Sequence, residues 1–112
     1  MGANLKFKPS GSADLARYEL YYKPHEAGVP LTPNNSVAKV DLGNPAVQAD
    51  GFIHVPLNTI AELQSLDGEY DLGVAAIDDA GNVSPLLTQG LVNISLDFLA
   101  PNPPSEASVY WN

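Results

Sequence analysis

Apolar and polar residues alternate in six short runs that cover most of the chain. The clearest is 17–23, where Tyr18, Leu20 and Tyr22 occupy every second position. Alternation with a period of two places one set of side chains on a buried face and the other in solvent, so each run predicts a half-buried β-strand. The runs are residues 5–8, 17–23, 37–42, 52–57, 69–76 and 92–98.

The segments between these runs are rich in residues that end strands. They contain Pro, Gly, Asn and Asp, which favour turns. One helical signal interrupts the series, because Thr59 and Glu62 have the spacing of a capping box, which predicts a helical turn or two before Leu63. Short strands with little helix predict a β-sandwich or a small barrel, and alternation with one dry and one wet face favours a mainly antiparallel sandwich.

The composition agrees with a single folded domain. The chain has 112 residues, of which 45% are apolar and 16% are charged, and this is too apolar for an intrinsically disordered chain. It contains no cysteine, which excludes disulfides and thiolate metal sites. No apolar run reaches the roughly 18 residues that a membrane-spanning helix needs.

The charge is unevenly distributed. The net charge is −8, all five Lys and Arg residues lie in the first 39 positions, and positions 40–112 carry ten acidic residues. Such a surface repels phosphate backbones, so we expect no nucleic-acid partner. We expect the acidic residues to form a solvated face that favours solubility.

The polar clusters point to little metal chemistry. His25 and His54 have no second nitrogen or sulfur ligand near them in the sequence, so we expect no transition-metal site. Asp78, Asp79 and Asn82 offer oxygen ligands within five residues and form a weak calcium candidate. Side-chain-to-backbone bonds in an ordinary turn explain the same three residues.

No motif marks a catalytic site or a bound cofactor. Ser, His and Asp residues are present, but the chain has no nucleophile elbow and no glycine-rich phosphate loop. Thirteen acidic residues are available, yet nothing selects a catalytic pair among them. We therefore expect a protein that is not an enzyme and binds no cofactor.

Three segments carry a likeness to a known family. Residues 18–24 (YELYYKP), 66–78 (LDGEYDLGVAAID) and 79–84 (DAGNVS) resemble, in turn, strand C, the E–F corner with strand F, and the F–G turn of bacterial members of the fibronectin type III family. Phe7 stands about where the family often has a strand B tryptophan. The resemblance covers residues 4–99 and implies an immunoglobulin-like antiparallel β-sandwich of six to seven strands.

The resemblance also implies roles for individual residues. Tyr70 would be the tyrosine of the E–F corner, with its ring in the core and its hydroxyl bonded to nearby backbone. Strands C and F are neighbours in the family's sheet, so Asp71 or Glu69 would lie beside Arg17 or Lys23. The residues expected to build the core are Phe7, Tyr18, Leu20, Tyr22, Tyr70, Leu72 and Val74.

The chain departs from the family pattern at both ends. It begins at what the resemblance makes strand B, so strand A is missing. Residues 100–112 start with a proline-rich segment and continue with Ala107, Val109 and Trp111 at alternating positions. They either open a following domain or supply the missing strand A. Since a vacant edge invites pairing with another chain, a homodimer that exchanges residues 100–112 is one hypothesis, beside a frayed or locally docked tail.

The expected function is that of a non-catalytic structural or interaction module. It would belong to a larger protein, extracellular or at the cell surface, and would space or dock neighbouring domains. The alternative is a carbohydrate-binding or enzyme-accessory domain that uses exposed aromatic side chains. We expect Tyr21 and Phe52 on outward faces of their strands. The candidate interaction residues are Tyr21, Phe52, Val109, Tyr110 and Trp111.

Overall fold

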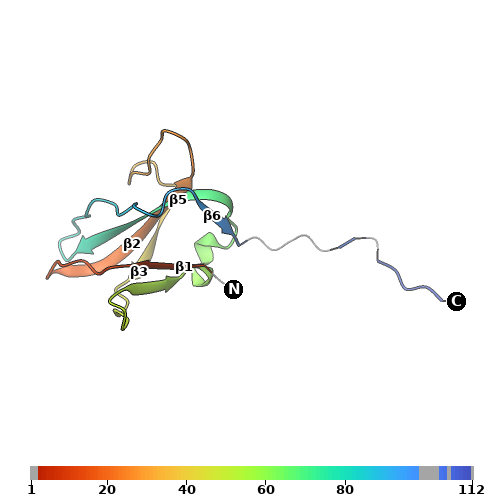
Figure 1. The fold of residues 1–112 in the computed structure, drawn as a ribbon, viewed down its shortest axis with the longest axis horizontal. Coiled ribbons are helices and arrows are strands. Elements are labelled where there is room, and N and C mark those ends of the chain that lie inside the picture. Colours follow the sequence, from red (N-terminus) through yellow and green to blue (C-terminus); the bar gives the residue numbers. More distant parts are fainter. Residues whose placement is uncertain (1–2, 99–103, 106, 112) are drawn as a thin grey trace.

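The computed structural model describes residues 3–98, 104–105 and 107–111, and its regular structure is almost entirely β (Figure 1). The strands are β1 (Asn4–Phe7), β2 (Leu15–Pro24), β3 (Ala38–Gly43), β4 (Ile53–Pro56), β5 (Asp67–Asp78) and β6 (Ile94–Asp97). Two 3-10 turns, η1 (Leu57–Thr59) and η2 (Ala61–Leu63), separate β4 from β5. All six predicted strands are confirmed, with ends that differ by a few residues.

The strands form two antiparallel sheets. In one sheet β1 pairs with β4, and in the other the order is β3-β2-β5-β6. The longest pairing joins β2 to β5, from Leu15 opposite Asp78 to Pro24 opposite Tyr70. The predicted all-β antiparallel architecture is confirmed, and the arrangement is consistent with a β-sandwich.

Side chains from both sheets build the main core. The ring of Phe7 on β1 meets that of Tyr18 on β2 edge to face, with centroids 4.9 Å apart, a favourable geometry for an aromatic pair. Leu20 on β2 and Leu63 in η2 are completely buried. The buried members of this core are Leu5, Phe7, Tyr18, Leu20, Tyr22, Val40, Ile53, Val55, Leu57, Ile60, Leu63, Leu72, Val74 and Leu96.

Tyr70 packs against this core with its ring partly buried. Its centroid lies 6.4 Å from that of Tyr22. No hydrogen bond joins its hydroxyl to the backbone in the part of the chain that the structure describes, so the bond implied by the family resemblance is missing. The hydroxyl of Tyr18 is the one that bonds to backbone, since it accepts from the N–H of Ser10 at 2.8 Å.

The outer face of the four-stranded sheet is covered as well. Tyr21, expected on an exposed outward face, is only 5% exposed and belongs to a second apolar cluster with Leu31, Ala75 and Ile77. The expectation was wrong because alternation shows which face a side chain takes, not what covers that face. The loop that carries Leu31 packs closely against β5 at Gly73, where an added Cβ atom would lie 3.1 Å from a methyl carbon of Leu31.

β6 begins later than the alternation predicts. Asn93 has a φ of 59°, a left-handed conformation that asparagine tolerates better than most residues. The alternation breaks there, so Val92, expected on the inward side, is 54% exposed. Residues 83–91 follow β5 without forming a regular strand, held by backbone bonds such as the reciprocal pair between Val74 and Leu87.

The helical signal corresponds to the two 3-10 turns, but the capping box does not form. The hydroxyl of Thr59 donates to the carbonyl of Pro56 at 2.7 Å, and no side chain caps the start of η2. The amide of Gln64 donates to the carbonyls of Leu57 and Ile60 and thereby ties the two turns together. The predicted length is confirmed and the predicted cap is wrong.

The tail beyond Phe98, in its described part, lies away from both sheets (Figure 1). Its described residues, 104–105 and 107–111, form no regular structure, and Figure 1 shows 107–111 far from β1. Val109, Tyr110 and Trp111 are 84%, 79% and 90% exposed. The described tail therefore does not fill a strand position beside its own β1. The rest of the predicted segment 100–112 lies outside the described residues.

Replacing a buried tyrosine tests the covered outer face. We expect Tyr21→Ala to lower the free energy of unfolding by about 3–5 kcal/mol, as other large aromatic-to-alanine changes in cores do. The control, Tyr110→Ala, removes the same atoms from an exposed position and should change this free energy by less than about 0.5 kcal/mol. Urea unfolding followed by circular dichroism measures both. Equal small effects would mean that the outer face is open.

Candidate functional site

A hollow of about 270 Å³ opens on the outer side of the four-stranded sheet. Its walls come from the loop after β2, which contributes Val29 and Leu31, and from the segment before β6, which contributes Thr88 and Val92. These walls are mainly apolar. His25 and Asp71 bring polar groups to the same hollow, so it is a concave site at which apolar and titratable side chains meet.

Beside the hollow lies a buried charged network of Lys23, Asp71 and His25. Lys23 and Asp71 face each other across β2 and β5, and their side chains are only 4% and 3% exposed. The ammonium of Lys23 lies 3.6 Å from the carboxylate of Asp71 and donates to the carbonyl of Pro24 at 3.1 Å. The expected contact between a basic residue of 17–23 and an acidic residue of 69–71 is confirmed for this pair.

Arg17, the other basic residue expected to take part, has different partners. Its guanidinium donates to Glu19 on the same strand at 3.1 Å and lies 4.0 Å from Asp41 on β3. Its neighbour on β5 is Ile77, not an acidic residue. Arg17 therefore partly compensates the buried carboxylate of Glu19 and does not contact Asp71 or Glu69.

Asp71 accepts two hydrogen bonds on the carboxylate oxygen that faces away from its ion pair with Lys23. The Nδ1 atom of His25 lies 2.8 Å from it, and the backbone N–H of Asn93 donates to it at 2.9 Å. Burial raises the pKa of Asp71, but these hydrogen bonds and the charges of His25 and Lys23 together outweigh burial and hold the pKa below its usual range. Since the carboxylate is ionised at neutral pH, Nδ1 of His25 carries the hydrogen in this bond.

The network orients His25 but does not join it to a nucleophile. An imidazole held by a carboxylate is one half of a nucleophilic site, and the other half is a hydroxyl or thiol within hydrogen-bond reach. Thr88 lines the same hollow, yet no hydrogen bond joins it to His25 in the described part of the chain. Lys23 compensates the charge of Asp71, while Glu26 adds a second carboxylate to the lining of the hollow. The apolar walls suit an apolar group.

His25 is a site residue that the sequence does not reveal. Its partner Asp71 is 46 positions away, and His25 follows the last residue of β2, where alternation no longer applies. The one available signal is the predicted contact between Lys23 and Asp71, because a histidine two residues after Lys23 is then close to the same carboxylate.

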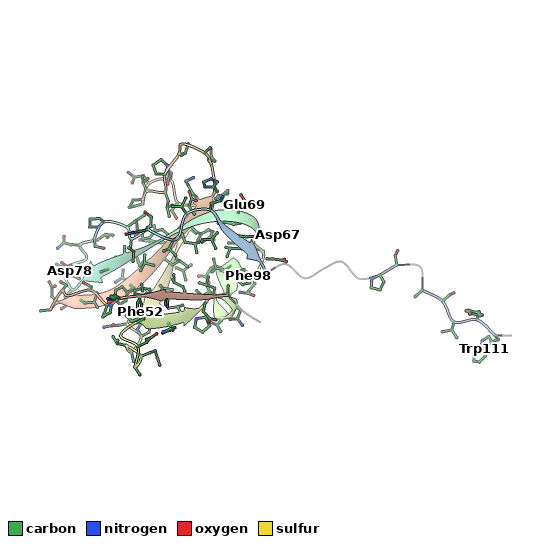
Figure 2. All side chains as sticks on the ribbon, in the orientation of Figure 1. Phe52, Asp67, Glu69, Asp78, Phe98 and Trp111 are labelled. Atoms are coloured by element: carbon green, nitrogen blue, oxygen red, sulfur yellow. The ribbon has the colours of Figure 1, made fainter. Side chains whose placement is uncertain are left out.

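A second candidate surface, which we call the basic patch, lies on the outer side of the β1–β4 sheet and comprises Lys6, Lys8, Phe52 and His54. The ammonium groups of Lys6 and Lys8 lie 4.8 and 5.6 Å from the centroid of the Phe52 ring, within the range of a cation–π contact. His54 stands opposite Lys6 and its Nε2 lies 2.8 Å from the carboxylate of Asp50. Phe52, labelled in Figure 2, is half-buried there.

The weak calcium candidate forms an ordinary turn. One carboxylate oxygen of Asp78 accepts from the backbone N–H groups of Ala80 and Asn82, and the other accepts from the side-chain amide of Asn82 at 3.0 Å. These bonds, with that from the Asn82 amide first, hold the pKa of Asp78 below its usual range. Asp79 donates its backbone N–H to the carbonyl of Asp14. No group of three or more acidic, His or Cys side chains in the described residues has metal-binding geometry.

The resemblance to the fibronectin type III family rests on residues 18–24, 66–78 and 79–84, because comparison with known proteins adds no support for it. The chain was compared with protein-family models, curated proteins and solved structures, and none of them matched. Within the described ranges, no helix is both long and apolar enough to cross a membrane.

Removing the charge of Asp71 tests the buried network. Asp71→Asn keeps an oxygen acceptor for Asn93 but leaves the ammonium of Lys23 buried without a counter-charge, so we expect the free energy of unfolding to fall by about 3–5 kcal/mol. Asp67→Asn, at an exposed position of the same strand, is the control and should change it by less than about 0.5 kcal/mol. Urea unfolding measures both. Identical midpoints for the two variants would contradict a stabilising role for Asp71.

A double variant separates the charge from the packing. Lys23→Met/Asp71→Asn leaves no buried charge, so it should recover part of the stability that Asp71→Asn loses. If the double variant is less stable than Asp71→Asn by the full effect of Lys23→Met alone, the two residues are not coupled.

The lowered pKa of Asp71 predicts a loss of stability in acid. The folded-state pKa lies below the value of about 3.9 for an unfolded aspartate, so the folded state binds this proton less readily than the unfolded state. The resulting stabilisation is fully present above the unfolded pKa and is lost as the pH falls through the folded pKa. Urea midpoints measured from about pH 6 to about pH 2 should fall more steeply in this window for the natural chain than for Lys23→Met/Asp71→Asn. Equal slopes would contradict the assignment.

Proposed function

We propose that this chain is a non-catalytic interaction module with a fibronectin type III-like arrangement, part of a larger extracellular or cell-surface protein, and that it docks a partner segment at the edge of β1. The observation that carries the proposal is this edge. β1 pairs with β4 on one side, and no strand of the described residues lies on its other side. An open strand edge is a template on which an incoming strand forms backbone hydrogen bonds.

The strand order supports the family arrangement. If β1, β2 and β5 correspond to strands B, C and F, then β4 and β6 correspond to E and G. The pairs β1–β4 and β2–β5–β6 then follow the sheet order of immunoglobulin-like sandwiches. Strand A belongs to the same sheet as B in that order, and it has no counterpart in the described part of the chain. In this arrangement the open edge of β1 is the position that strand A would take.

The position of the chain ends favours docking over spacing. β1 begins and β6 ends at the same end of the molecule (Figure 1). A module that spaces two neighbours along a line holds them at opposite ends. In this chain, neighbouring domains would both be attached at one end of the molecule. The two sheets would then project away from those domains, with the β1 edge and the basic patch accessible to a partner.

The carbohydrate-binding alternative loses two of its three aromatic residues. Tyr21 is buried in the second apolar cluster, and the ring of Phe52 is in contact with the ammonium groups of Lys6 and Lys8. Of the three, Tyr110 remains largely exposed. Stacking on a sugar requires an accessible ring face, so the aromatic residues support protein docking better than sugar binding.

Site-specific cross-linking tests the docking function. A photoreactive amino acid at position 6 of the intact protein, in its source cells, should give one discrete adduct that maps to an extended segment of the partner. The matched control is the same amino acid at position 39, since Lys39 is exposed on β3, an edge of the other sheet. Absence of a discrete adduct at position 6, or equal labelling at both positions, would contradict docking at β1.

A further inference from the structure

The tail carries exposed apolar side chains in a strand-like pattern. Val109 and Trp111 are 84% and 90% exposed, and Figure 2 shows Trp111 far from the sheets. A tryptophan buries about 150–250 Å² in a core, so its exposure leaves a large favourable contribution unused. Ala107, Val109 and Trp111 occupy alternate positions, which places them on one side of an extended segment.

We propose that residues 107–111 of one chain add as an antiparallel strand to β1 of a second copy, and that the exchange is reciprocal. This inference rests on the proposed docking function and names its partner. Leu5 and Phe7 of β1 point into the core, and opposite residues of an antiparallel pair share a face. Val109 then lies opposite Leu5 and Ala107 opposite Phe7, which brings the apolar side of the tail to the inner face of the sheet.

Charge favours β1 over β6 as the acceptor. Between positions 100 and 112 the sequence has one charged side chain, Glu106, and its position next to 107 places it on the outward side of the added strand. In the proposed register Glu106 falls opposite Lys8, beside Lys6. At β6 it would meet Asp97, which already stands opposite Asp67, so the tail would be repelled there.

The two remaining edges suit the tail less well. β4 ends at Pro56, which has no N–H to give to an added strand. β3 carries one basic and one acidic side chain, Lys39 and Asp41, on its exposed side. These two charges cancel, so β3 does not attract Glu106 of the tail. β1 is thus the edge whose exposed side chains are basic and whose inner side chains are apolar.

The tail suits β1 of another copy better than its own. Since β6 ends at the end of the molecule where β1 begins (Figure 1), a tail that returned directly along its own β1 would run parallel to it. Antiparallel pairing within one chain requires the tail to pass the length of β1 and then reverse. Pro101, Pro103 and Pro104 each fix their own φ and restrict the preceding residue to extended conformations, so the sequence disfavours a reversal there.

Trp111 is the only tryptophan of the chain and reports the pairing directly. As the concentration of the full chain rises, we expect the mass from light scattering to increase from 11.9 kDa to twice this value. Over the same range the tryptophan emission should shift to shorter wavelength, because the indole leaves water. A monomer with short-wavelength emission at every concentration would mean docking in its own chain, and a monomer with the emission of exposed tryptophan would mean no docking. Either result overturns the proposal.

A proline in the added strand tests its backbone pairing. The N–H of Leu57 donates to the carbonyl of Ala3. Leu5 and Phe7 therefore direct their backbone groups to β4, and Lys6 directs its own to the open edge. Ser108 lies opposite Lys6 in the proposed register. Ser108→Pro therefore removes a backbone donor that faces β1 and fixes φ, and it leaves the two sheets intact because Ser108 is exposed in the monomer. We expect this variant to remain monomeric at concentrations where the natural chain is half dimeric. Ser108→Thr keeps the donor and is the matched control, which should still dimerise. A dimer that forms equally well with Ser108→Pro overturns the proposal.

A charge exchange tests the edge and the register. Lys8→Glu should weaken the dimer by roughly tenfold, since a reciprocal dimer contains the pair with Glu106 twice. Lys8→Glu/Glu106→Lys should restore the affinity, and Lys39→Glu on β3 should leave it unchanged. If the double variant binds as weakly as Lys8→Glu, or if Lys39→Glu weakens the dimer equally, β1 is not the acceptor in this register.

The two proposals fail separately. A discrete adduct from position 6 to residues 107–111 of this same sequence, together with a concentration-dependent dimer, supports both. A chain that stays monomeric but gives a discrete adduct to a different protein removes self-pairing and keeps the docking function. A monomer with no discrete adduct at position 6 removes both.

Discussion

The pairing of β2 with β5 holds the rest of the structure in place. These two long strands lie at the centre of the four-stranded sheet. One face of the pair carries Leu20 and Val74 of the main core, and the other carries Tyr21 and Ala75 of the second cluster. Because both faces are covered, a slip of one residue would exchange side chains between two clusters of different volume. The register is therefore fixed by packing on both sides of the sheet.

The buried charged network adds a second constraint on the same register. A slip would separate Lys23 from Asp71 and leave two buried charges without partners, which is strongly unfavourable. Even in place, the attraction within such a pair only partly offsets the cost of removing both charges from water. The bonds from His25 and Asn93 to Asp71 supply part of the difference. They also attach the loop after β2 and the start of β6 to β5, so one carboxylate positions both walls of the hollow.

The parts of this structure that follow from the sequence are those governed by local alternation. The six strands need only a period of two. The contact of Lys23 with Asp71 also requires that β2 and β5 be neighbours, which was expected from the family resemblance and not from alternation. The burial of Tyr21 does not follow, because it depends on Leu31 in a loop that has no periodicity. The contact of His25 with Asp71 does not follow either, because the two residues are 46 positions apart and His25 lies in the same loop without periodicity. Val92 shows a third limit, since the left-handed backbone at Asn93 interrupts an alternation that the sequence continues.

The charges on β1 bear on which pairing this edge permits. Lysines on an edge strand commonly oppose association, because two like edges that meet place their charges side by side. Two β1 strands meeting in this way would bring Lys6 and Lys8 of one copy against those of the other. The same lysines attract an acidic segment, and the tail contributes Glu106 without any basic residue. The basic patch thus disfavours edge-to-edge assembly of β1 with itself and favours a closed, reciprocal exchange, in which each tail and each β1 edge is used once.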